Sequence, residues 1–197
     1  MRTAAGAALG ALLFTGLFPG EARAHLVTTG LGPFYDGISH FALTPEDLLP
    51  ALALALLAGL SGPRYGRTVL FALPAAWLAG GLLGLSRSSE VLMPALTAST
   101  LLVLGALVAL DRKLPLGLVA GLAAALGLFH GYLNGTAKLG ALGLSGVAVT
   151  LFFLVALAAA FVVSLRAPWS RIAVRVAGSW LVAISMLMLG WTFRAGG

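Results

Sequence analysis

Residues Leu142–Leu165 read LGLSGVAVTLFFLVALAAAFVVSL, a run without a single charged side chain. These 24 residues, at about 1.5 Å of rise each in a helix, are long enough to cross the roughly 30 Å hydrocarbon layer of a bilayer. Other long apolar runs precede and follow this one in the chain. We therefore expect an all-α membrane protein built as a bundle of spanning helices.

The composition supports this class and excludes several others. Of the 197 residues, 60% are hydrophobic and only 9% are charged, whereas about a quarter of a soluble domain is charged. A water-soluble globule, a disordered chain and a coiled coil are thereby excluded. The absence of cysteine excludes disulfides, thiolate zinc sites and iron–sulfur clusters. The twelve Lys and Arg residues are scattered at the ends of apolar runs, which argues for membrane orientation and against nucleic-acid binding.

The first segment of the chain has the pattern of a secretory signal peptide. One positive charge at Arg2 precedes an apolar run from Ala4 to Phe18, and an A-x-A site ends at Ala24. We expect residues 1–24 to be removed, which leaves His25 as the first mature residue on the outer side. The alternative is an uncleaved N-terminal anchor.

The mature domain, residues 25–197, is predicted to contain six spans. Gly30, Gly32, Pro33 and Gly37 should interrupt any long helix before residue 44. Residues 44–47, Thr-Pro-Glu-Asp, then form a helix start with a capping Thr, a Pro at the first position and two acids at the positive end of the dipole. Span one follows to about Leu60, and the others are Thr68–Leu85 with a tolerated Pro74, Val91–Leu110, Leu114–Leu133, Leu142–Leu165 and Ile172–Trp191.

Basic residues give the orientation of these spans. With His25 outside, seven fall in inner loops (Arg64, Arg67, Arg112, Lys113, Arg166, Arg171 and Arg175) and three fall outside (Arg87, Lys138 and Arg194). This distribution agrees with the positive-inside rule. We expect a multi-pass protein of the bacterial inner membrane with its mature N-terminus outside.

Most of the histidines and acidic residues are predicted to lie at the outer face in this topology. They include all three histidines and four of the five mature carboxylates: His25, Asp36, His40, Glu46, Asp47, Glu90 and His130. Asn134 follows His130 at i+4 and would share its helix face. Imidazole and carboxylate together suit divalent first-row metals, and ionisable groups within spans indicate function.

Each of these residues also has an ordinary structural explanation. Glu46 and Asp47 suit a helix start, and His130 could bond to a neighbouring carbonyl. His25 could be a loose terminus and Asp36 a turn residue. The glycines Gly131 and Gly135 could be a packing notch, part of a set of small residues that would let helices approach: Gly80, Gly81, Gly84, Gly121, Gly127 and Gly131.

Two segments carry a resemblance to a known family. Residues 32–49, with His40 followed by Glu46 and Asp47, and residues 126–131, Leu-Gly-Leu-Phe-His-Gly, resemble the HupE/UreJ family. The size, the leader and the six predicted spans are similar as well. The resemblance implies a hydrogenase or urease accessory function and a secondary permease for nickel or cobalt.

The sequence departs from this family's motifs at several positions. The first motif resembles His-Pro-x-x-Gly-x-Asp-His: His40 matches, Glu46 takes the Asp position and Asp47 stands where the last His is expected. The second resembles His-Gly-x-x-His-Gly-x-Glu. His130, Gly131 and Gly135 match it, whereas Asn134 replaces the second His and Ala137 the Glu.

These observations predict a secondary transporter for a divalent transition-metal ion, with nickel or cobalt as its substrate and no permanently bound cofactor. The predicted ligands are His40, Glu46, Asp47 and His130, with assistance from His25, Asp36 and Asn134. The predicted partners are the lipid bilayer, the metal ion and either a second copy or a metalloenzyme-maturation protein.

The alternative is a non-transporting accessory protein that binds metal or a partner at the outer face. This alternative arises because no acid or His that could pass an ion across the membrane is predicted deep in the other spans. An enzyme is not expected, since no H-E-x-x-H or G-x-S-x-G motif occurs.

Overall fold

The computed structural model describes residues 29–87 and 92–195, and its regular structure there is entirely helical. This confirms the all-α class. The predicted signal peptide, His25 and Glu90 lie outside the described residues. The helices are α2 (Pro33–Leu43), α3 (Pro45–Ser61), α4 (Pro63–Leu85), α5 (Pro94–Leu110), α6 (Leu116–Thr136), α7 (Gly140–Ser164) and α8 (Pro168–Ala195).

The prediction of six spans is not confirmed. Within the described residues, α4, α6, α7 and most of α8 are long and apolar enough to cross a membrane. A fifth span results if α2 and α3, which meet at a bend of 74°, are counted as one broken span. The helix α5 is apolar but has only 17 residues, because it begins at Pro94 and not at the predicted Val91.

The helix α2 is a second difference from the sequence prediction. Its 11 residues include Gly37, which was expected to interrupt helical structure. Gly37 is tolerated because it lies against α7: a Cβ at this position would be 2.0 Å from the carbonyl oxygen of Gly143. The absence of a side chain therefore permits the close approach of two helices.

The break between α2 and α3 follows from Pro45. A residue before proline avoids the helical conformation, and Thr44 is extended, with φ −102° and ψ 94°. Pro45, Glu46 and Asp47 occupy the first turn of α3 as predicted. The predicted side-chain cap is absent, because the Thr44 hydroxyl donates to the His40 carbonyl at 2.6 Å.

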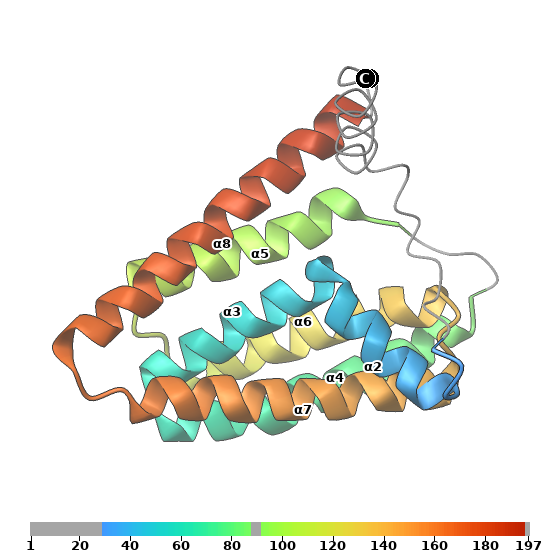
Figure 1. The fold of residues 1–197 in the computed structure, drawn as a ribbon, viewed down its shortest axis with the longest axis horizontal. Coiled ribbons are helices and arrows are strands. Elements are labelled where there is room, and N and C mark those ends of the chain that lie inside the picture. The colour runs from blue at the N-terminus through green and yellow to red at the C-terminus, as the bar shows by residue number, and fades with distance from the viewer. Residues whose placement is uncertain (1–28, 88–91, 196–197) are drawn as a thin grey trace, which may run out of the picture.

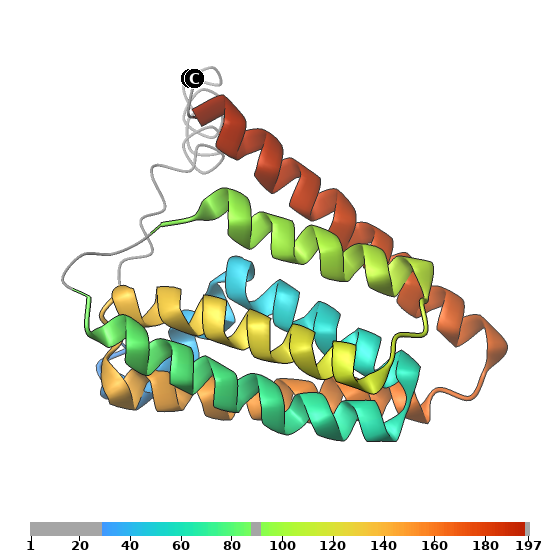
Figure 2. The same ribbon diagram turned by 180° about the vertical axis from the view of Figure 1, so that it is seen from behind.

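The helices form two groups. The most extensive pairing joins α4 to α6, and α7 packs on α2, α3 and α4. The second group is the pair α5 and α8, which run side by side and meet the remaining helices mainly through α3 (Figures 1 and 2). Membrane helices gain little from burying apolar surface in each other, so close packing must hold them together.

Reciprocal glycines provide that packing between α4 and α6. A Cβ at Gly131 would lie 2.1 Å from the Trp77 carbonyl oxygen, and one at Gly84 would lie 2.2 Å from that of Tyr132. Gly80, Gly127 and Gly135 are similarly tight against the opposite backbone. The packing-notch interpretation is thus correct for this interface. Gly121, which we expected to contribute, faces open space, because nothing lies within 4 Å of the place that a Cβ would take.

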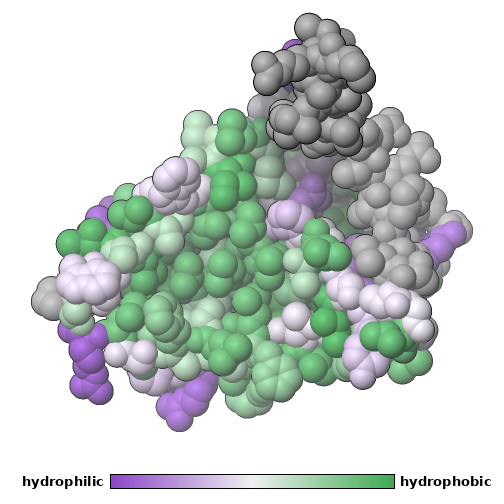
Figure 3. All heavy atoms as spheres, viewed as in Figure 1, coloured by the Kyte–Doolittle hydropathy of each residue, from purple (hydrophilic) through white to green (hydrophobic). Residues whose placement is uncertain are grey.

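The predicted inner loops meet at one end of the bundle. The Tyr65 hydroxyl donates to the Leu114 carbonyl at 3.1 Å, and Arg171 donates to Asp111 through Nε and Nη2. These contacts join the α3–α4, α5–α6 and α7–α8 turns. The seven basic residues predicted for the inner loops lie in these turns or beside them. Figure 3 shows a broad apolar face with hydrophilic side chains mostly at its margins, as a lipid-facing surface requires.

Candidate functional site

A buried polar cluster lies between α3 and α6, toward the end of the bundle opposite the basic turns. The exposed fraction is 0% for His130 and 4% for both Asp47 and Asn134. Ionisable groups at such depth are costly unless they are paired. Each of these three side chains has a partner within the cluster.

The hydrogen bonds of the cluster converge on Asp47. Trp77 can only donate, and its Nε1 lies 3.3 Å from Asn134 Oδ1. This fixes the Asn134 amide so that Nδ2 donates to Asp47 Oδ2 at 2.8 Å. The other carboxylate oxygen, Oδ1, lies 2.8 Å from His130 Nδ1. Asp47 therefore lies between two hydrogen-bond partners, and its oxygen Oδ1 favours the tautomer of His130 that carries its proton on Nδ1.

The second ring nitrogen of His130 faces α5. Its Nε2 lies 3.0 Å from the Thr100 hydroxyl, which is also 2.7 Å from the Thr97 carbonyl. A neutral His130 accepts a hydrogen bond from Thr100 at Nε2. A charged His130 donates to Thr100, whose own proton then goes to Thr97. Thr100 thus pairs with either charge state, and in the neutral state Nε2 carries a lone pair.

Aromatic rings surround the imidazole. Trp77 and His130 have centroids 5.4 Å apart, and Phe129 packs edge-on against the imidazole at 5.2 Å. Phe41, which is fully buried, packs edge-on against Trp77 at 5.7 Å. This apolar surrounding limits the access of water and strengthens the hydrogen bonds of Asp47.

Local sequence explains how these side chains come together. α6 continues to Thr136, so His130 and Asn134 share one face at i and i+4, as predicted. Asp47 stands in the first turn of α3 because Pro45 starts that helix. Trp77 reaches Asn134 because Gly131 lets the two backbones touch. Asp47 is therefore more than a helix-start residue, and His130 bonds to side chains and not to a carbonyl.

The other predicted site residues lie elsewhere or are arranged differently. Glu46 is exposed but interacts electrostatically with Asp47 and His130. His40 is buried on α2. Asp36 accepts from the backbone and hydroxyl of Thr29 at 2.6 and 2.7 Å, as a local turn contact. Within residues 29–87 and 92–195, no group of three or more His, Asp or Glu side chains is close enough to hold a metal ion. Metal ligation by the predicted set thus stays a prediction.

Two residues of the cluster were not identified from the sequence. Trp77 lies within an apolar span and Thr100 is one of several small hydroxyl residues in α5. A signal existed for Trp77, because a buried indole N–H requires an acceptor. No comparable signal distinguishes Thr100 from Thr97 or Ser99.

Comparison with known protein families decides the family of this chain. The family model described as HupE / UreJ protein matches residues 12–188, which is most of the sequence. The chain belongs to the HupE/UreJ family. No curated protein and no solved structure matches it.

As a HupE/UreJ protein, the chain is a multi-pass membrane protein of a family linked to nickel and cobalt handling. The structure adds an observation about its departures from the motifs. Asp47 and Asn134 each stand where a His was expected, and they are hydrogen-bonded to one another. The two substituted positions are therefore in contact with each other. The Asp47 carboxylate stands in place of one imidazole, and the Asn134 amide stands in place of the other.

Proposed function

We propose that this protein is a secondary transporter for a divalent transition-metal ion, nickel or cobalt, which it captures at the outward end of α3 and α6. The observation that carries the proposal is the hydrogen bond between His130 Nδ1 and Asp47 Oδ1. Metal-binding histidines usually donate their second ring N–H to a carboxylate, which fixes the tautomer and strengthens the other nitrogen as a ligand. Asp47 would thus be a positioning residue and His130 Nε2 the ligand.

The ion would displace the Thr100 hydroxyl from Nε2. The additional ligands would come from Glu46 and His40, as the sequence predicted, together with water. Glu46 suits this role because its side chain is exposed and lies near the Asp47–His130 pair. Assembly of this set requires side-chain movement, since the described residues contain no preformed group of three. Such a weak, partly hydrated site releases its ion readily, as transport requires.

Uptake of nickel and cobalt into proteoliposomes tests this function. We expect uptake by the unmodified protein and at least a tenfold loss in Glu46→Gln, whose exposed side chain can change without disturbing the fold. Asp111→Asn is the matched control, because it removes the same charge at the opposite end of the bundle. His130→Gln should also lose uptake. Retained uptake in both Glu46→Gln and His130→Gln would contradict the proposed site.

A specific observation favours the second candidate, a membrane accessory protein that binds metal without transporting it. In the described part of the chain, α4 and α7 contain no Asp, Glu or His that would carry an ion beyond the cluster. Metal binding to the purified protein, measured by calorimetry beside the uptake assay, separates the two. Binding that depends on His130 without uptake would leave only the accessory function.

A further inference from the structure

At the basic end of the bundle, two neighbouring cavities lie between the ends of α3, α4, α7 and α8 and the α5–α6 and α7–α8 turns. The first has a volume of about 380 Å³, and the second of about 320 Å³. Leu60 and Arg171 line both, so the two cavities adjoin, and together they are called the recess. It is separate from the Asp47–His130 cluster, which lies toward the other end of the helices.

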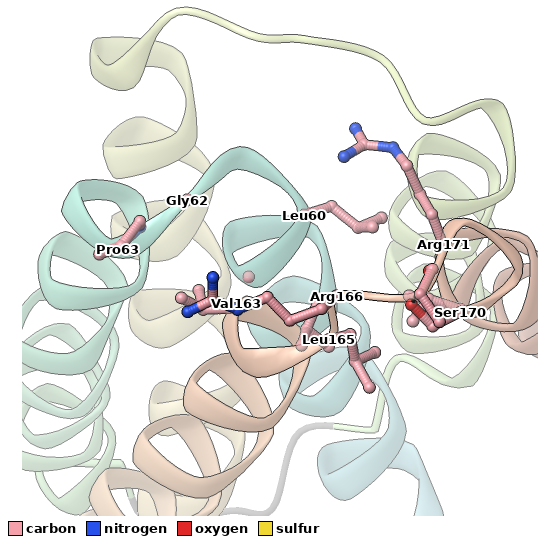
Figure 4. Close-up of a pocket in the computed structure, with 12 residues that line it drawn as sticks. Leu60, Gly62, Pro63, Val163, Leu165, Arg166, Ser170 and Arg171 are labelled. Atoms are coloured by element: carbon pink, nitrogen blue, oxygen red, sulfur yellow. Dashed lines mark hydrogen bonds between the residues drawn. The ribbon is translucent and has the colours of Figure 1, made fainter.

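The recess has cationic walls. Arg166 and Arg171 line the first cavity, and Lys113 and Arg171 line the second, whereas no carboxylate lines either one. Asp111 holds Arg171 through Nε and Nη2 at 2.5 and 2.7 Å, which leaves Nη1 available. Arg166 has no ion-pair partner in the part of the chain that the structure describes. Figure 4 shows Arg166 reaching toward the side where Gly62 and Pro63 lie.

Most of the remaining lining is apolar, apart from Ser61, Tyr65 and Ser170. The first cavity is also lined by Leu60, Val162, Val163, Leu165 and Val174. α4, which begins at Pro63 in this wall, has 23 residues, enough to reach from one interface to the other. Its first turn therefore lies at headgroup depth. A free anion needs only the cations, whereas a recess that combines cations with apolar lining at the end of a spanning helix also matches the acyl chains of a lipid.

We propose that this recess binds an anionic phospholipid. Its phosphodiester would contact Arg166, Lys113 and the free Nη1 of Arg171, and its acyl chains would lie along Leu60, Val163 and Val174. Basic pockets between membrane helices bind acidic headgroups in this way. The positive end of the α4 dipole adds to the attraction. The lipid would join α3, α4 and α7 to α8, which has few other contacts with that group of helices.

Native mass spectrometry of the full chain in neutral detergent tests the proposal. The probes are phosphatidylglycerol, phosphatidylcholine and inorganic phosphate. We expect the unmodified protein to bind phosphatidylglycerol at least tenfold more tightly than phosphatidylcholine. Arg166→Gln should weaken that binding about fivefold, which corresponds to the roughly 1 kcal/mol that one basic residue contributes near a membrane surface. The double variant Lys113→Gln with Arg166→Gln should weaken it about 25-fold.

A matched double variant at the other end provides the control. Arg87→Gln with Lys138→Gln removes the same charge from exposed positions outside the recess, and we expect it to bind phosphatidylglycerol as the unmodified protein does. The proposal is overturned if both double variants lose binding equally, since the effect is then one of net charge. It is also overturned if the recess variant binds normally, or if inorganic phosphate competes as well as the lipid. All four substituted side chains are on the surface, so the variants should fold.

Discussion

Replacing Gly131 with Ala should weaken the α4–α6 interface that places Trp77 on the polar cluster. A Cβ at this position would lie 2.1 Å from the Trp77 carbonyl oxygen and 2.8 Å from its Cα. Since nonbonded heavy atoms need roughly 3.5 Å, the added Cβ and this oxygen must move apart by about 1.4 Å. The hydrogen bond from Trp77 to Asn134 is already 3.3 Å long, and this separation would break it. Overpacking and the lost hydrogen bond together should cost about 2–4 kcal/mol.

Gly121→Ala is the matched control on the same helix, because nothing lies within 4 Å of the added Cβ. It should be neutral or stabilising by up to about 1 kcal/mol through helix propensity. The free energy of unfolding can be measured for both variants by SDS titration in mixed micelles, followed by circular dichroism. A difference below about 0.5 kcal/mol between the variants, a typical effect of a neutral surface substitution, would refute this account of the interface.

Three further predictions concern the cluster and the topology. Asp47→Asn should destabilise the protein by about 1–3 kcal/mol in the same titration, because one amide cannot accept from both His130 and Asn134 and a buried donor stays unpaired. Thr100→Val should lower stability by about 1 kcal/mol and change the nitrogen-15 NMR signal of His130 Nε2. Thr150→Val is its control, because it loses only a hydrogen bond within α7 and should leave that signal unchanged. Because the chain has no cysteine, single cysteines introduced by Arg67→Cys and Lys138→Cys report topology directly. An impermeant maleimide added to intact spheroplasts should label only position 138. Labelling of position 67 alone would show that the predicted orientation is inverted.

Much of the fold could be read from the sequence because a bilayer imposes strong rules on composition. The run at Leu142–Leu165 became α7 with ends at Gly140 and Ser164, and α6 also lies close to its predicted range. Helix starts at prolines were equally readable, as Pro45 shows. Length was less certain: α5 is shorter than predicted, and α2 formed despite Gly37, because tertiary packing on α7 compensates for its poor helix propensity.

The sequence by itself determined that this is an apolar helical membrane protein with its histidines and acids biased toward one end, since hydropathy and charge are properties of each residue. Only the tertiary structure decided which polar groups meet. Asp47 and His130 are 83 positions apart, and Trp77 and Asn134 are 57 apart. Their contact depends on glycines that let α4 and α6 touch, and on a break at Thr44 that sets the start of α3 beside α6. These hydrogen bonds are a property of the arrangement, so no pattern along the chain could reveal that Asp47 bonds to His130.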